Sequence, residues 1–188
     1  MDQRAIVCKV IDALEAASVP YMVVGSLSSN VFGIVRSTKD ADIVVELGDR
    51  RVSEVTSLLG PEFHLQQQIT FESITGTTRH IIDVQDSPFK IELFRLSSDP
   101  HDIERFHRRR EYKAAQLDRL VFLPTPEDIV ITKLRWAISS DRYKDRDDVR
   151  NVIAVQADDL DWPYIHRWCD EHGTRQLLEE IRGTIPPI

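Results

Sequence analysis

The sequence has few cysteines, no long apolar run and no surplus of basic residues. Its two cysteines, Cys8 and Cys169, lie near opposite ends of the chain, without a CxxC pair or a neighbouring Cys/His cluster, which argues against a zinc site. No stretch approaches the roughly 20 consecutive apolar residues that a membrane helix needs. Charges interrupt the N-terminal segment too often for a signal peptide. We therefore expect a cytoplasmic protein without a membrane partner.

The charge balance and the length limit the class of protein. The chain has 188 residues, with 24 Lys and Arg against 31 Asp and Glu, so its net charge is −7. An acidic protein of this kind is not expected to coat nucleic acid, because such binding draws on Lys and Arg that neutralise phosphates. The composition, 41% hydrophobic and 29% charged, is typical of a globular protein. The length suggests one domain, or a core domain with a helical appendage.

The first half of the chain alternates between helical and strand patterns. Apolar spacing predicts a helix that ends before Pro20, and a β-branched run predicts a mostly buried strand that begins at Ala41. Turn residues between two later apolar runs predict a β-hairpin. The expected elements are a helix over 3–17, a strand over 21–24, a short helix capped by Ser28 or Ser29, a strand over 41–47, a helix over 50–59, and hairpin strands over 80–84 and 89–94.

The second half reads as mostly helical. Thr125-Pro126-Glu127-Asp128 is a strong helix start, with a capping side chain, a first-turn proline and two acids. The fold class is therefore α/β (α+β), with a mixed sheet core over residues 1–123 and a helical region over 124–188 that completes the cleft. The expected elements are helices over 102–116, 126–139, 145–156, 163–172 and 175–182, and a strand over 120–123.

Two carboxylates at the start of one strand carry the clearest chemical signal. Asp40 and Asp42 are two residues apart, so their side chains point to the same face of the strand and can bind one metal together. Phosphoryl and nucleotidyl transfer use such clusters to hold Mg²⁺. Gly25 and Ser26 end the preceding strand, where a glycine lets the backbone approach a phosphate and nearby amides can bind its oxygens.

These motifs resemble the signature of the nucleotidyltransferase superfamily, in which Gly-Ser precedes Asp-x-Asp on the next strand. The family has a third carboxylate on a neighbouring strand, in a Lys-apolar-Asp-apolar-Phe context. This chain has Lys90-Ile91-Glu92-Leu93-Phe94 there, so Glu92 replaces the usual Asp. The resemblance implies a nucleotidyltransferase fold in which Asp40, Asp42 and Glu92 are the catalytic and metal-binding residues.

A later run resembles the AbiEii-like nucleotidyltransferases of abortive infection. In that group a helix Lys is followed by Lys-Asp-x-x-Asp, and this resemblance spans about residues 20 to 150. Lys133 would neutralise phosphate charge. The candidate nucleotide-binding residues are Gly25, Ser26, Arg36, Lys39, Lys133, Lys144, Asp145 and Asp148.

The implied function is a Mg²⁺-dependent transfer of a nucleoside monophosphate from a nucleoside triphosphate to an acceptor hydroxyl. The acceptor would be RNA, a protein or a small molecule, and a toxin of this kind would have a cognate antitoxin as partner. An antibiotic nucleotidyltransferase is the alternative within enzymes. The Glu92 departure favours a second alternative, a non-catalytic binding module or antitoxin-type partner that keeps the fold.

Two residue groups keep a second interpretation. A hairpin that pairs Val84 with Phe89 places Asp83 opposite Lys90 on the face that carries Glu92, so Asp83 is the alternative third ligand. The basic stretch between 105 and 113 is interpreted as a solvated helix face, with a polyanion docking site as the alternative. The aromatic side chains expected to fill the core of the helical region are Trp136, Trp162 and Trp168.

Overall fold

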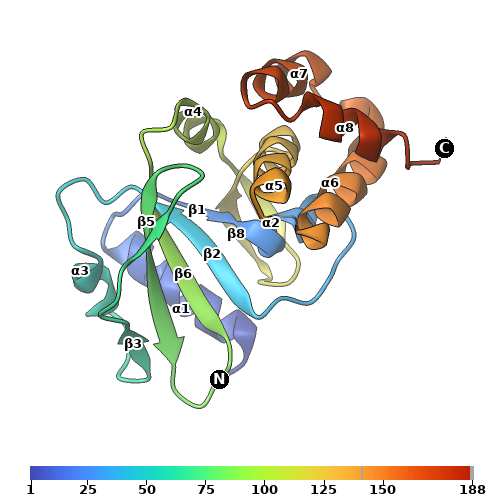
Figure 1. Cartoon of the computed structure of the whole chain (residues 1–188). Helices are drawn as coiled ribbons and strands as arrows, with labels where there is room; N and C mark the ends of the chain where they lie inside the picture. Colours follow the sequence, from blue (N-terminus) through green and yellow to red (C-terminus); the bar gives the residue numbers. More distant parts are fainter. Residues whose placement is uncertain (141, 187–188) are drawn as a thin grey trace.

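The computed structural model describes residues 1–140 and 142–186. Most of the first half forms one sheet with flanking helices, and the last third is helical (Figure 1). The elements follow in the order α1 (Gln3–Ala16), β1 (Tyr21–Val24), α2 (Gly25–Phe32), β2 (Asp40–Val45), α3 (Val52–Thr56), β3 (Phe63–Leu65), β4 (Thr70–Glu72), β5 (Thr77–Val84), β6 (Lys90–Arg95), α4 (Pro100–Arg108), β7 (Arg110–Ala114), β8 (Arg119–Leu123), α5 (Pro126–Ser140), α6 (Tyr143–Gln156), α7 (Trp162–Glu171) and α8 (Arg175–Arg182).

The main sheet is mixed, as the sequence predicted. Its strands run in the order β1-β2-β6-β5-β3, and β4 also pairs with β5. Strands β2 and β6 are parallel, whereas β1 is antiparallel to β2 and β5 is antiparallel to β6. The hairpin pairs Asp83 with Lys90 and Ile81 with Glu92, which confirms the predicted register. Strands β7 and β8 form a separate two-stranded sheet.

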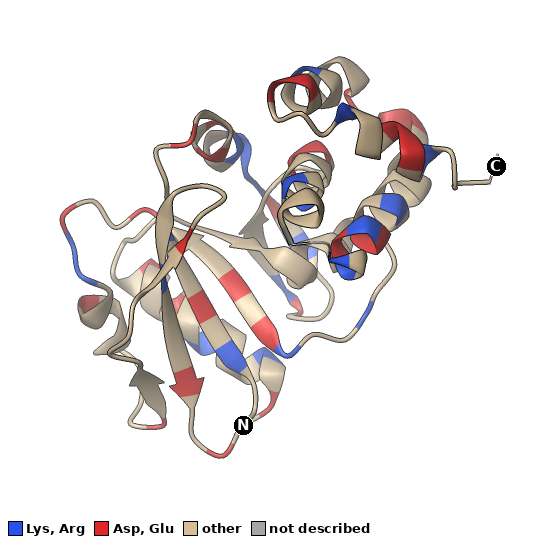
Figure 2. Cartoon of the chain, viewed as in Figure 1, with Lys and Arg blue, Asp and Glu red and all other residues tan. Residues whose placement is uncertain are grey.

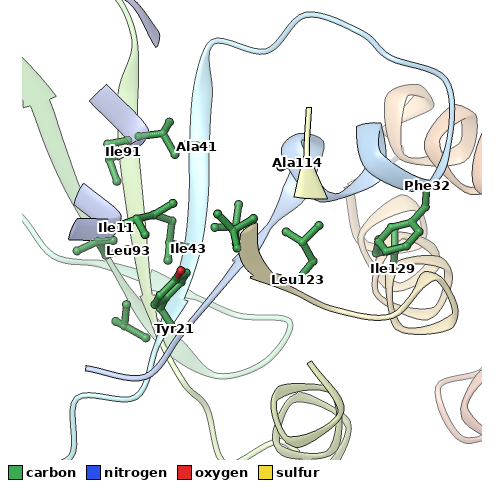
Figure 3. Packing of buried hydrophobic residues seen from close by; sticks show 14 of the residues in the cluster. Ile11, Tyr21, Phe32, Ala41, Ile43, Ile91, Leu93, Ala114, Leu123 and Ile129 are labelled. Carbon is green, nitrogen blue, oxygen red and sulfur yellow. The ribbon is translucent and has the colours of Figure 1, made fainter. Parts of the chain in front are cut away.

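One face of the main sheet is mostly apolar and packs on α1. Alternate residues of β2 and β6, among them Ile43, Ile91 and Leu93, are buried there with the apolar stripe of α1. Figure 3 shows these side chains gathered around Ile11. Because side chains alternate along a strand, the intervening residues point to the opposite face.

The opposite face of the sheet is apolar at one end and charged toward the other. A small buried cluster of Met22, Val24, Val44 and Phe106 lies where α4 covers the sheet. Asp42 lies two residues before Val44 on β2, and Glu92 lies beside Asp42 on β6, two residues before Phe94, which packs against the cluster. This face therefore has a polar part that no core side chain fills.

The helical region packs on the same hydrophobic core as the sheet. One continuous cluster contains residues of α1, β2 and β6 together with Leu134, Val149 and Leu178, and Figure 3 shows Phe32 of α2 beside Ile129 of α5. The sheet and the helical region therefore share one core. The domain boundary after residue 123 stays a prediction. Within the described residues, no helix combines the length and apolarity needed to cross a membrane.

The predicted helix over 102–116 is wrong in its second half. Helix α4 ends at Arg108, and β7 follows at once and pairs with β8. Helix-forming residue types suggested a continuous helix, but Tyr112 and Ala114 alternate with exposed neighbours, which is a strand pattern. Hydrogen-bonded pairing with β8 stabilises residues 110–114 as a strand and not as a helix.

Other predicted boundaries also change. Helix α2 begins at Gly25, so Ser28 and Ser29 lie inside it and their hydroxyls donate to the Gly25 carbonyl instead of capping the helix. Helix α3 is shorter than the predicted 50–59. The short strands β3 and β4 were not predicted, because three residues are too few to establish a period.

The basic stretch is not a solvated helix face. Arg105 is buried and bonds Asp102, and Arg108 packs over the Tyr164 ring and reaches Asp128. These side chains join α4 to the helical region, so they do not form part of a solvated helix face. Of the three tryptophans only Trp168 is fully in the core; Trp162 is half-buried and Trp136 lines a cavity.

Asp128 is the centre of a buried polar cluster between α4, α5 and α7. Its carboxylate accepts hydrogen bonds from Tyr164 at 2.7 Å, from Thr125 at 2.9 Å and from Arg108 at 3.2 Å, and it lies 3.2 Å from His101 Nε2. Burial would raise the pKa of Asp128, but these partners outweigh burial and hold the pKa below its usual value. The ionised carboxylate therefore stabilises the helix packing.

We predict that Asp128→Ala lowers the free energy of unfolding by about 3 to 5 kcal/mol, because it leaves buried partners without their shared acceptor. Urea unfolding followed by circular dichroism measures this change. Asp12→Ala is the matched control, since the Asp12 side chain is 65% exposed where it pairs with Arg119, and it should cost less than about 1 kcal/mol. Equal losses for the two variants would contradict this role for Asp128.

Candidate functional site

The polar face of the sheet borders a cavity of about 210 Å³. Its walls come from β2, β5 and β6 on one side and from α2, α4 and α5 on the other. Figure 2 shows acidic bands side by side on β2 and β6, and charges of both signs on α5 and α6. The cavity thus lies where the sheet face changes from apolar to charged.

Three carboxylates reach this cavity from neighbouring strands. Asp40 and Asp42 lie on β2, and the parallel register places Glu92 of β6 directly beside Asp42. Asp40 accepts a hydrogen bond from the Thr38 hydroxyl at 2.8 Å. Glu92 accepts one from Arg79 Nη1 at 2.9 Å. The sheet therefore brings together the three carboxylates that the sequence analysis named.

Gly25 occupies a position where a side chain does not fit. Its φ is +64°, a left-handed conformation that L-residues rarely adopt. A Cβ atom there would lie 1.9 Å from Asp42 Oδ2. Gly25 thus allows the chain to turn directly from β1 into α2 while Asp42 lies against the turn.

Crowding changes the acidity of the central carboxylate. Burial raises the pKa of Asp42 to about 7, and the negative charges of Asp40 and Glu92 act in the same direction. The cations Lys133 and Arg142 oppose the shift without cancelling it. The site is therefore short of positive charge around Asp42.

A second charged cluster forms the wall opposite the sheet. Lys133 of α5 lies 2.7 Å from Asp145 and 2.8 Å from Asp148, both on α6. Arg36 donates two hydrogen bonds to Asp148, at 2.8 and 2.9 Å, and Arg142 Nε lies 3.2 Å from Asp145. The bond to Asp148 raises the pKa of Arg36, and the pKa of Asp148 is low because Arg36 and Lys133 outweigh its burial.

The structure brings some of the predicted nucleotide-binding residues into the cavity and leaves others outside it. Gly25, Ser26, Lys133 and Asp145 line it. Arg36 and Asp148 are not among its described lining residues, but Asp148 pairs with Lys133 and Arg36 bonds Asp148. Lys39 and Lys144 are exposed and are not among its described lining residues either.

Asp83, the alternative third carboxylate, lies outside the described lining of the cavity. It accepts a hydrogen bond from Gln66 at 2.7 Å and pairs with Lys90 at 3.4 Å. Its side chain is 41% exposed. It therefore forms the surface pair that the hairpin register predicted.

Several lining residues were missed by the sequence analysis. Arg79 and Arg105 enter from β5 and α4, and Trp136 and Arg142 lie at the α5 end, with the Arg142 guanidinium 5.6 Å from the Trp136 ring. Trp136 and Arg142 had usable signals, since Trp136 follows Lys133 by three residues on the same helix and Arg142 precedes Asp145 by three residues. Arg79 and Arg105 belong to elements distant in sequence.

Asp40 and Asp42 fit a divalent cation such as Mg²⁺ chemically. Carboxylate oxygens are the ligands that Mg²⁺ prefers, and the raised pKa of Asp42 shows that a cation would relieve the crowding. Within residues 1–140 and 142–186, however, no three His, Cys, Asp or Glu side chains are grouped closely enough to hold an ion. Glu92 is bonded to Arg79 instead.

Similar folds occur among solved structures. No protein-family model matches this sequence, and no curated protein sequence matches it. The antibiotic-resistance factor ANT(2'')-Ia superposes with a TM-score of 0.62 at 13% identity, covering 96% of each chain. Its complex with adenylyl-2''-tobramycin gives 0.60, also at 13% identity, over 93% of this chain and 98% of that chain.

Two further structures are similar over most of the chain. An antigenic nucleotidyltransferase-like protein from Paracoccidioides brasiliensis has a TM-score of 0.52 at 17% identity, covering 78% of this chain and 72% of that chain. The lincomycin-bound lincosamide antibiotic adenylyltransferase LnuA has a TM-score of 0.50 at 11% identity, covering 82% and 98%. At these identities the likeness concerns the fold, and the chain has the mixed α/β fold of nucleotidyltransferases.

Proposed function

We propose that this protein is a nucleotidyltransferase that moves a nucleoside monophosphate from a nucleoside triphosphate to an acceptor hydroxyl. The observation that carries the proposal is the cavity in which Asp40, Asp42 and Glu92 face a cationic wall beside the Gly25 turn. The structural similarity to ANT(2'')-Ia over nearly the whole chain supports it.

In the proposed reaction, the acceptor oxygen forms a bond to the α-phosphorus of the triphosphate. The bond from that phosphorus to the oxygen that bridges to the β-phosphate breaks, and pyrophosphate leaves with the electron pair. The hydroxyl proton passes to one of the cavity carboxylates, Asp40, Asp42 or Glu92. Mg²⁺, when bound by Asp40 and Asp42, supplies positive charge to the attacking and leaving oxygens.

The wall opposite the carboxylates is suited to a polyphosphate. Lys133, Arg36 and Arg142 carry three positive charges and Asp145 and Asp148 two negative charges, which leaves +3 − 2 = +1 for a ligand. Because the two aspartates fix the Lys133 ammonium from one side, its position is set before a nucleotide arrives. We assign Lys133 to phosphate binding and Asp145 and Asp148 to its positioning.

The acceptor class is RNA, a protein or a small molecule. ANT(2'')-Ia in complex with adenylyl-2''-tobramycin and LnuA with lincomycin support a small-molecule acceptor, because this chain covers nearly all of both proteins. The AbiEii-like alternative, a toxin with a cognate antitoxin, is supported by the Lys144-Asp145 and Asp148 motif.

A second candidate function is a non-catalytic binding module. It is favoured by one observation, the pairing of Glu92 with Arg79 in place of three converging carboxylates. The two functions differ in whether a monophosphate is ever transferred to an acceptor, so detection of the transfer by mass spectrometry separates them.

We predict that a nucleoside triphosphate and Mg²⁺ together raise the melting temperature. A ligand that binds only the folded state adds about 2.7 kcal/mol of stability at 100 times its dissociation constant. Thermal unfolding with each of ATP, GTP, CTP and UTP, with and without Mg²⁺, measures this effect. A well-folded protein that responds to none of the four would contradict nucleotide binding.

We predict that Asp42→Asn abolishes Mg²⁺-dependent transfer while the protein stays folded, because it removes the central carboxylate of the site. Mass spectrometry of candidate acceptors, mixed with protein, nucleoside triphosphate and Mg²⁺, detects the added monophosphate. Asp83→Asn is the matched control, since it removes a strand carboxylate that pairs with Lys90 outside the cavity. Unchanged transfer by Asp42→Asn would refute the assignment.

We predict that the same Asp42→Asn variant gains stability with rising pH relative to the parent protein. The unfolded carboxyl has a pKa of about 3.9, and folding raises it to about 7. The folded parent thus binds the proton more tightly and loses stability between about pH 4 and about pH 7. Urea unfolding without divalent cations, at about pH 5 and about pH 8, measures the difference, and an equal difference at both values would contradict the shift.

A further inference from the structure

The third carboxylate of the site has a partner that competes with a metal. Glu92 lies beside Asp42 in the parallel register, on the face that lines the cavity. Its Oε2 nevertheless accepts a hydrogen bond of 2.9 Å from Arg79 Nη1. Over the part of the chain that the structure describes, no three potential ligands are grouped closely enough to hold an ion.

The strand register explains why Arg79 reaches Glu92. In the β5/β6 pair Glu92 is opposite Ile81, and Arg79 is opposite Phe94 two residues further on. Arg79 is therefore the diagonal neighbour of Glu92 on the same face of the sheet, within reach of a long side chain. A glutamate, with one methylene more than an aspartate, extends across this diagonal.

The Arg79–Glu92 ion pair is buried enough for its attraction to be weakly screened by water. It is also open enough to the cavity for another ligand to replace one partner. The side chains of Arg79 and Glu92 are 31% and 16% exposed, and both line the cavity. An arginine charge cannot be lost by deprotonation near neutral pH. The pair therefore persists at neutral pH until another ligand of the Glu92 carboxylate, such as a cation, displaces the guanidinium.

We propose that Arg79 is a positioning residue that holds Glu92 away from Asp40 and Asp42 until a divalent cation displaces it. This inference rests on the proposed function. In the metal-free protein, Arg79 pairs with the third carboxylate, Glu92, beside the crowded Asp42. When a cation binds Asp40 and Asp42, Glu92 exchanges Arg79 for the ion and completes the ligand set.

Removing the Arg79 charge should affect the affinity for a divalent cation and the stability of the metal-free protein in opposite directions. Removing the Arg79 charge frees Glu92, so the affinity for a divalent cation rises. The same change leaves Glu92 without this partner beside two other carboxylates, so the metal-free protein becomes less stable. A residue that only packs the sheet would lower stability without raising metal affinity.

The test measures Mn²⁺ binding by calorimetry, with a non-hydrolysable nucleoside triphosphate analogue present so that no turnover occurs. We expect Arg79→Met to lower the Mn²⁺ dissociation constant about fivefold, which corresponds to about 1 kcal/mol. Arg79→Lys keeps the charge and should stay near the parent value. Arg95→Met is the matched control, because Arg95 lies on β6, three residues after Glu92 and so on the opposite face, where it donates to the Gly48 carbonyl.

A double-mutant cycle separates this mechanism from a general charge effect. In the Glu92→Gln background, Arg79→Met should change Mn²⁺ binding less than about twofold, because the carboxylate it restrains is gone. An equal tightening in both backgrounds would mean that Arg79 acts only as a distant charge, and would overturn the proposal. Weaker Mn²⁺ binding by Arg79→Met would overturn it as well.

Glu92→Asp tests the Arg79–Glu92 contact by changing the glutamate. This test stays informative even if Arg79→Met does not fold. The shorter carboxylate keeps its charge and loses its reach to Arg79, so Mn²⁺ should bind more tightly than in the parent. Looser binding would overturn the proposal. Failure of the parent itself to bind Mn²⁺, with or without the nucleotide analogue, would instead overturn the proposed function and the inference with it.

Discussion

The parallel pairing of β2 with β6 is the constraint on which the site depends. It places Asp42 beside Glu92, and the antiparallel pairing of β1 with β2 places Asp42 beside the turn at Gly25. Strands β2 and β6 also bury apolar side chains against α1, so the register cannot slip by one residue without moving core side chains into the cavity. The packing of the core thus holds like charges together against their repulsion.

The charged wall opposite the sheet offsets the repulsion among the cavity carboxylates only in part. The two aspartates of α6 neutralise most of the positive charge of Lys133, Arg36 and Arg142. What remains does not cancel the effect of burial and neighbouring carboxylates on Asp42, whose pKa is raised to about 7. Such a charge imbalance inside a cavity is typical of a site that binds a charged ligand.

Buried polar contacts also decide how the helical region is attached. The Asp128 cluster joins α4, α5 and α7, and Arg105 of α4 bonds Asp102 and reaches Thr132 of α5. Arg105 and Arg108, which make these contacts from α4, come from a stretch whose composition suggested a solvated helix. Composition alone could not distinguish the two, because the same arginines serve either role until their partners are known.

The sequence alone determined the mixed α/β class, most helices and strands, the hairpin register, and the position of Asp40 and Asp42 on one face of a strand. These features follow from local periodicity and turn chemistry, which act over a few residues. The resemblance to nucleotidyltransferases, and no local pattern, pointed to Glu92 as the third carboxylate. Only the tertiary structure decided that 110–114 is a strand, that Lys39 and Lys144 stay outside the cavity, and that Arg79 binds Glu92. The physical reason is that contacts between separate elements depend on how those elements pack, and no local pattern in the chain records that packing.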